Sequence, residues 1–227
     1  MSLVRRPNGR FVLLDSYDLD ADDQRELMAL TDDGKEIEAV LNVHPFHTVH
    51  CKSIKEMLPH ARLIGTRRHH SEAAHLDWDA DVLEDEATRQ QFSDTFDFSI
   101  PDGVYFIPED ESIHVSSVIV RHRESGIIHV DDTLMFLDIP ALLEKFGPGP
   151  RLRFHPNLAG GLEKRVGAAD DYIRWAKQLG QDWAETKIIC AAHKGIMRLT
   201  DQTFSDSIDT ALEHSMQTLD KHREKYG

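Results

Sequence analysis

The sequence contains three histidines within seven residues, His44, His47 and His50, directly after an apolar run over residues 37–43. An apolar run of this length between polar neighbours is typical of a buried strand. The histidines therefore lie where that strand opens into a loop or a helix. Imidazole groups gathered at the end of a buried strand can bind a divalent metal ion.

Polar residues also accompany three other strand-like segments. They are His114 within residues 112–120, the pair Asp131 and Asp132 after residues 126–130, and His193 after residues 187–192. Neutral imidazole and carboxylate groups are ligands that Zn²⁺, Mn²⁺ and Fe²⁺ accept. If the four segments converge in the fold, these side chains can surround one ion.

The order of these residues, a His cluster, a lone His, an Asp and a final His, resembles the metallo-β-lactamase-fold superfamily of metal-dependent hydrolases and oxidoreductases. The family's first motif, His-x-His-x-Asp-His, is similar to residues 44–50, and its lone His to His114. Its Gly-Asp-Thr-Leu-Phe motif resembles residues 131–136, with Asp132 in the metal position. Its Gly-His-Gly motif resembles residues 192–195, with His193 as the histidine. With a strand-like segment over residues 9–15, the resemblance covers residues 9–195.

The first motif departs from the family pattern. Without a gap, Phe46 replaces the family's second His, Thr48 replaces its Asp and Val49 replaces its last His. With a small insertion, His47 and His50 can replace the lost ligands, because residues three apart on a starting helix share one face. In the family the missing Asp commonly binds the second metal and orients the attacking water. The motif therefore supports metal binding more directly than it supports hydrolysis.

The resemblance implies a site for one or two divalent ions, with zinc expected first and iron or manganese as alternatives. The expected metal ligands are His44, His47, His50, His114, Asp132 and His193. Of these, Asp132 and His193 are also expected to take part in catalysis. A bound ion lowers the pKa of water toward about 7 and polarises the substrate. The expected function is hydrolysis of a small-molecule ester, thioester, lactone or amide through a metal-bound hydroxide.

Two other functions stay open at this point. One is a metal-binding relative without hydrolase activity, either an iron redox protein or a degenerate fold used for binding. The other is an unrelated α/β domain whose histidines bind no metal. Iron predicts coloured protein, whereas zinc or manganese predicts colourless protein.

Simpler roles compete for several of these residues. Asp131 is expected to stabilise a turn or cap a helix, since Asp bonds readily to nearby backbone, and it is the alternative to Asp132 as a ligand. His69 and His70 follow two arginines in an expected loop, so they are predicted to be exposed to solvent.

Composition limits the classes of partner. The 227 residues can bury one sizeable core, and the formal charge of −14 offers no basic surface to a nucleic-acid backbone. A small-molecule substrate is therefore expected. No segment approaches the roughly 20 apolar residues of a membrane span, and residues 1–6 lack the apolar core of a secretory signal. A cytoplasmic protein is expected, with its oligomeric state open. The two cysteines, Cys51 and Cys190, are expected to be buried thiols rather than a disulfide.

Hydrophobic periodicity predicts alternating strands and helices. Strands are predicted over residues 11–14, 37–43, 62–65, 104–107, 113–120, 127–130 and 187–190. Helices are predicted over residues 20–30, 48–58, 168–179 and 204–225. Residues 66–99 are expected to form surface helices or a lid, residues 123–126 a turn and residues 146–150 a loop. This order favours a layered α/β class. With the resemblance, it predicts one domain over residues 1–227, a four-layer αββα sandwich of the metallo-β-lactamase type.

Overall fold

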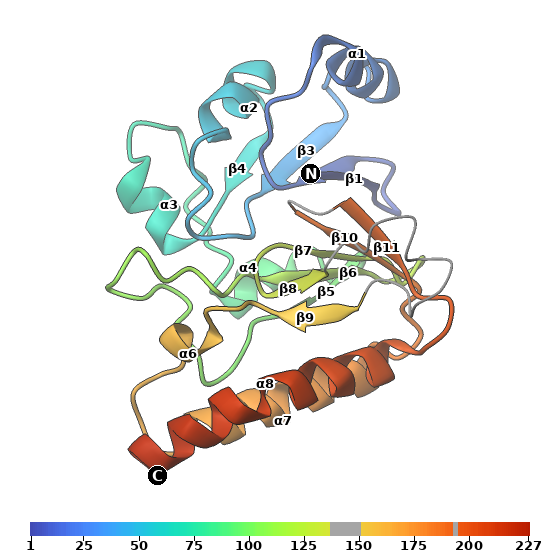
Figure 1. The fold of residues 1–227 in the computed structure, drawn as a ribbon. Helices are drawn as coiled ribbons and strands as arrows, with labels where there is room; N and C mark the ends of the chain where they lie inside the picture. The colour runs from blue at the N-terminus through green and yellow to red at the C-terminus, as the bar shows by residue number, and fades with distance from the viewer. Residues whose placement is uncertain (137–150, 193–194) are drawn as a thin grey trace. The chain divides into compact units, whose positions relative to one another are not determined.

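The computed structural model describes residues 1–136, 151–192 and 195–227 (Figure 1). The chain divides into two units, Met1–Asp97 and Phe98–Gly227. The expected loop at residues 146–150 and the candidate ligand His193 lie outside the described residues. The single domain expected over residues 1–227 stays a prediction. The two units are described in turn.

The first unit is built on a four-stranded sheet in the order β1-β2-β3-β4. Its strands are β1 (Ser2–Arg5), β2 (Phe11–Leu14), β3 (Ile37–Leu41) and β4 (Arg62–Ile64), and its helices are α1 (Ala21–Leu30), α2 (Cys51–Met57), α3 (Arg67–Glu72) and α4 (Glu86–Gln90). Strands β2, β3 and β4 run parallel, whereas β1 pairs with β2 antiparallel. The alternating order of strand and helix predicted for this part of the chain is confirmed.

One apolar cluster holds the helices of this unit to its sheet. Leu13, Val40 and Leu63, from three neighbouring strands, share a cluster with Leu27 of α1 and Ile54 of α2. All five side chains are buried, and each contributes about 1.5–3 kcal/mol relative to an exposed position. The sheet and the two helices therefore form a stable support for the loops that follow the strands.

The second unit contains a five-stranded sheet in the order β11-β10-β7-β6-β5 and a two-stranded sheet of β8 and β9. Its strands are β5 (Phe96–Ser99), which starts just before the unit boundary, β6 (Ile119–His122), β7 (Ile128–Val130), β8 (Leu134–Phe136), β9 (Leu152–Phe154), β10 (Ile188–Ala191) and β11 (Gly195–Arg198). Its helices are α6 (Leu158–Gly161), α7 (Ala168–Asp182) and α8 (Phe204–Tyr226). Strands β6 and β7 pair antiparallel across the predicted turn at residues 123–126, which is closed by a hydrogen bond of 2.8 Å from the Gly126 N–H to the His122 carbonyl.

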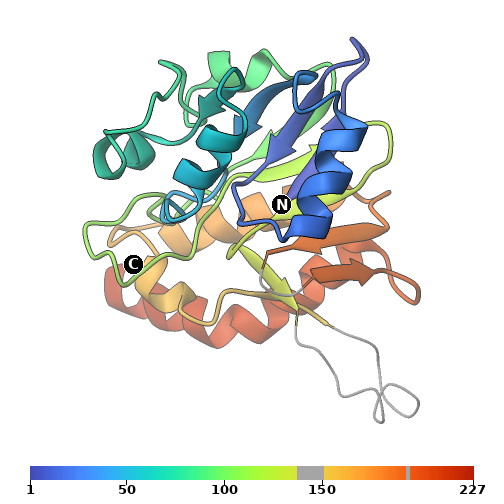
Figure 2. The same cartoon turned by 90° about the horizontal axis from the view of Figure 1, so that it is seen from above.

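Helices α7 and α8 lie side by side and carry much of the core of the second unit (Figure 2). In α8, Ile208, Leu212 and Leu219 recur at helical spacing and are buried, so they form one apolar face of the helix. The other sides of the helix are rich in charged residues. Within residues 1–136, 151–192 and 195–227, none of the helices combines the length and the apolar character that a membrane span needs.

Two predicted strands of the second unit are wrong or too long. In place of the strand over residues 104–107, Val104 makes an isolated bridge with Leu162. Of the strand over residues 113–120, the structure keeps the last two residues, in β6. The apolar pattern marked burial correctly, since Val115 and Val118 are buried, but burial does not require a strand partner.

Replacing Gly103 by Ala is expected to destabilise the protein by about 3 kcal/mol or more, from backbone strain and overpacking together. Gly103 has a φ of +74°, and an added Cβ would lie 2.0 Å from the carbonyl oxygen of Ala168. Urea unfolding followed by circular dichroism measures the loss.

Gly167 provides the matched control. It has a similar φ of +79°, but the nearest atom to an added Cβ, on Arg165, is 4.0 Å away. Gly167→Ala should therefore cost only the backbone strain, about 1–2 kcal/mol. Equal losses for the two variants would contradict the close packing of Gly103 against α7.

Candidate metal centre

The loop that carries the histidine cluster begins where β3 ends, and Asp15 fixes its start. Asp15 follows β2, the neighbouring strand, and its carboxylate accepts a hydrogen bond of 2.8 Å from the backbone N–H of Val43. Asp15 has a φ of +64°, a left-handed conformation in which Asp is one of the more tolerated residues. His44 follows directly and is fully buried.

Asn42 and Cys51 hold the same loop from the inside. The Asn42 Oδ1 atom accepts hydrogen bonds from Ser16, of 3.2 Å from its N–H and 2.7 Å from its hydroxyl. The Cys51 thiol lies 3.5 Å from Asn42 Oδ1 and 3.5 Å from the His47 carbonyl. Burial raises the pKa of Cys51 to about 11, so in the metal-free protein it is a protonated thiol, as expected of a buried cysteine.

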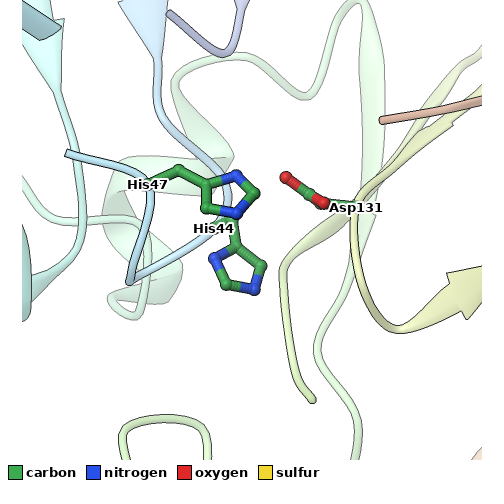
Figure 3. A group of neighbouring side chains, drawn as sticks. All are labelled: His44, His47 and Asp131. Carbon is green, nitrogen blue, oxygen red and sulfur yellow. The ribbon is translucent and has the colours of Figure 1, made fainter. Parts of the chain in front are cut away.

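His44 and His47 present two imidazoles side by side, as Figure 3 shows. Their ring centroids lie 4.0 Å apart with planes inclined by 29°. Each ring offers one ligand atom, and these two atoms lie within 4.8 Å of one another. Two nitrogens bound to one zinc ion at about 2.0–2.1 Å each are at most about 4.2 Å apart. The pair is therefore close to a geometry in which both rings bind the same ion.

His44 also makes a hydrogen bond that matters for metal uptake. Its Nδ1 atom accepts the backbone N–H of Phe46 at 3.2 Å, so in the neutral ring the proton is on Nε2. A metal bound through Nδ1 would displace this amide, and a metal bound through Nε2 would need the ring proton on Nδ1, which breaks the same hydrogen bond.

His50 has different surroundings from those predicted. Helix α2 begins at Cys51, and His50 is the residue before it, so His47 and His50 do not share a face of one helical turn as expected. The Nδ1 atom of His50 lies 3.0 Å from the carboxylate of Asp18, and its ring lies 5.4 Å from that of Tyr17. Its assignment as a metal ligand stays a prediction.

His69 is fully buried, so the predicted exposed loop is wrong at this position. It lies on α3, and its Nδ1 atom accepts the backbone N–H of Thr66 at 3.0 Å. Its ring packs on Gly65, where an added Cβ would lie 2.8 Å from it, and beside Trp78. Burial lowers the pKa of His69 to about 4. The spacing of Thr66 and His69 is that of a capping box, which was the available sequence signal. The neighbouring His70 is half-buried, with its ring stacked on that of Trp78.

In the second unit, two acidic side chains follow β7. Asp131 is 2% exposed and Asp132 is 7% exposed. The next residue, Thr133, accepts the backbone N–H of Ser117 through its hydroxyl at 2.7 Å and so ties this turn to the segment that carries His114. His114 is half-buried, and its ring centroid lies 6.4 Å from that of His155.

The side chains labelled in Figure 3, His44, His47 and Asp131, each offer one atom of a type that binds a divalent metal. Two neutral imidazoles and a carboxylate form a donor set that suits zinc, and also iron or manganese. The donor chemistry of this chain therefore fits a divalent metal. The sequence had favoured Asp132 over Asp131 as the ligand, and both side chains are buried.

Comparisons with solved structures identify the fold. The chain is similar to DIM-1 metallo-β-lactamase, with 14% identity, 96% of this chain and 85% of that chain covered, and a TM-score of 0.53. It is also similar to the metallo-β-lactamases of Erythrobacter litoralis (13%, 95% and 83%, TM-score 0.57) and Pontibacter korlensis (12%, 96% and 85%, TM-score 0.51). No protein-family model and no curated protein matches the sequence. The chain thus has the metallo-β-lactamase fold, as its motifs predicted.

Acid should destabilise the metal-free protein through His69. Since the folded-state pKa is about 4 and the ordinary value is 6.5, the unfolded chain takes up a proton first as the pH falls. The stabilisation is fully present above pH 6.5 and is lost as the pH falls toward 4, by up to about 1.4 kcal/mol per pH unit. Between pH 7 and pH 5, the free energy of unfolding of His69→Gln should fall by about 2 kcal/mol less than that of the native protein. Urea unfolding at the two pH values measures this difference.

The exposed His75 serves as the control for this measurement. His75→Gln should lose as much stability between the two pH values as the native protein does. An unchanged pH dependence in His69→Gln would show that His69 is not held neutral by burial.

Proposed function

We propose that this protein is a metal-dependent hydrolase that acts on a small-molecule ester, thioester, lactone or amide. The observation that carries the proposal is the pair of stacked imidazoles, His44 and His47, at the end of a buried strand in a chain with the metallo-β-lactamase fold. The structures with this fold named above are metallo-β-lactamases. Their likeness supports a metal-dependent hydrolase-like fold and leaves the substrate to experiment.

The proposed metal ligands come from both parts of the sequence. His44 and His47 supply imidazoles, and the turn after β7 supplies a carboxylate from Asp131 or Asp132. His114 and His193 complete the set by their place in the motif order. His50, beside Asp18, is proposed as a further ligand from that order alone.

The roles of the protein's own groups follow from this set. A divalent ion, when bound, acts as a Lewis acid and makes water more acidic near neutral pH. His44 and His47 hold the ion, and their stacking fixes the direction of both rings. Asp132 and His193 are proposed to bind and transfer the proton of the attacking water. The charge of −14 disfavours polyanionic substrates and is compatible with a small molecule.

One observation favours a second candidate function, a metal-binding protein without hydrolase activity. Thr48 stands where the resembling family commonly has the Asp that orients the attacking water, and a hydroxyl does not replace that carboxylate. Under this alternative the metal is iron in a redox site, or the site only binds. Metal identity separates the two candidates, since iron gives coloured protein.

Elemental analysis of the purified, untagged protein is expected to show near-stoichiometric zinc, lost in His44→Ala/His47→Ala. The double variant removes two of the three or four ligands that a zinc site needs. Hydrolysis of p-nitrophenyl acetate, a thioester, a lactone and nitrocefin should be lost together with the metal.

His75→Ala is the control, because it removes an exposed histidine from the same unit. It should keep both the metal and the activity. Bound iron without hydrolysis would favour the redox alternative. No metal in the native protein, even after incubation with zinc, manganese or iron, would refute the proposed function.

A further inference from the structure

Helix α3 contacts the histidine loop through Arg68, and both lie in the first unit. The Nη1 atom of Arg68 donates a hydrogen bond of 3.3 Å to the backbone carbonyl of Pro45. Its guanidinium carbon lies 4.2 Å from the ring centroid of Phe46, a cation–π contact. Arg68 therefore touches two successive residues that lie between His44 and His47.

His69, the next residue, acts on the same loop from a buried position. Its Nδ1 atom accepts the Thr66 N–H, so the proton of the neutral ring is on Nε2. This Nε2–H is buried and has no hydrogen bond of ordinary geometry within the described residues. The backbone carbonyl of His47 is the acceptor that acts on the ring and opposes the fall of its pKa. The His69 ring therefore lies close enough to the His47 backbone for the two to interact.

The neighbours of His69 hold its ring in this position. Gly65 has no side chain, which leaves room for the ring, and Trp78 packs beside it at 5.0 Å between centroids. Capping boxes ordinarily have Glu or Gln at the position that His69 occupies. Of these, Glu satisfies the Thr66 N–H but offers no second donor when ionised. Neutral histidine and glutamine can accept the Thr66 N–H and also offer an N–H donor.

We propose that Arg68 and His69 are positioning residues that hold residues 45–47 in place, so that the two imidazoles of His44 and His47 keep their stacked arrangement ready for a metal ion. The inference rests on the proposed function, because it concerns the same ligand pair. Neither residue contacts the ion. Residues that contact and orient the metal-binding side chains typically contribute about 10–100-fold to metal affinity.

Arg68→Met provides a test in which the charge effect and the positioning effect change the metal affinity in opposite directions. Met keeps an apolar contact with Phe46 but cannot donate to the Pro45 carbonyl. By charge alone, removing a cation near a dication strengthens metal binding. Positioning predicts the opposite, a zinc affinity at least about tenfold weaker in competition with a chromogenic chelator. Arg67→Met is the matched control, since Arg67 is exposed and pairs with Asp85 instead.

A second pair of variants tests His69. His69→Gln keeps an acceptor for the Thr66 N–H and a donor for the His47 carbonyl, so it should bind zinc within about threefold of the native protein. His69→Leu removes both groups and should weaken zinc binding at least about tenfold. Circular dichroism and thermal unfolding of each metal-free variant show whether it is folded, and Arg68→Met tests the proposal independently if His69→Leu is not.

The outcomes separate this inference from the proposed function. Weaker zinc binding in Arg68→Met and His69→Leu, with Arg67→Met and His69→Gln near native, supports positioning. Native affinity in folded Arg68→Met overturns it while leaving the metal site intact. Equal weakening in Arg67→Met overturns it as well, since the effect would not be specific to the loop. Absence of zinc binding in the native protein refutes the proposed function, and this inference with it.

Discussion

The hydrogen bond from the Val43 N–H to the Asp15 carboxylate is the constraint on which the candidate metal centre depends. It joins the loops that follow two neighbouring parallel strands and determines where β3 ends. A buried carboxylate is costly unless it is hydrogen-bonded, so this pairing disfavours any register in which the loop starts elsewhere. His44 follows immediately, and its burial is a consequence of that register.

Packing against α3 helps to hold the histidine loop, residues 44–47, at a position where the family motif has a metal ligand. Phe46 stands where a metal-binding His is expected, and it provides the ring against which Arg68 lies. His47, one residue later, stacks on His44 instead. An aromatic ring in place of a ligand reduces the number of donors but gives the loop an additional contact with α3. The altered motif is therefore compatible with an ordered ligand pair.

Much of the fold could be predicted from local patterns. Asp20 before α1 and Thr203 before α8 act as helix caps, and both helices begin within a residue of the expected positions. Strand β2 was predicted at its observed bounds because it is apolar and fully paired. The strand predictions for residues 104–107 and 113–118 were wrong because apolar residues can be buried by neighbouring segments without joining a sheet.

The sequence by itself determined the α/β class, the position of the histidine cluster at a strand end and the acidic pair after β7. These depend on residue type and on contacts close along the chain. Tertiary structure alone decided which histidines matter to the loop. His69 was expected in solvent and is buried because Gly65 and Trp78 leave space for its ring, while His50 pairs with Asp18. Such choices depend on which individual side chains pack together, and hydrophobic periodicity carries no information about them.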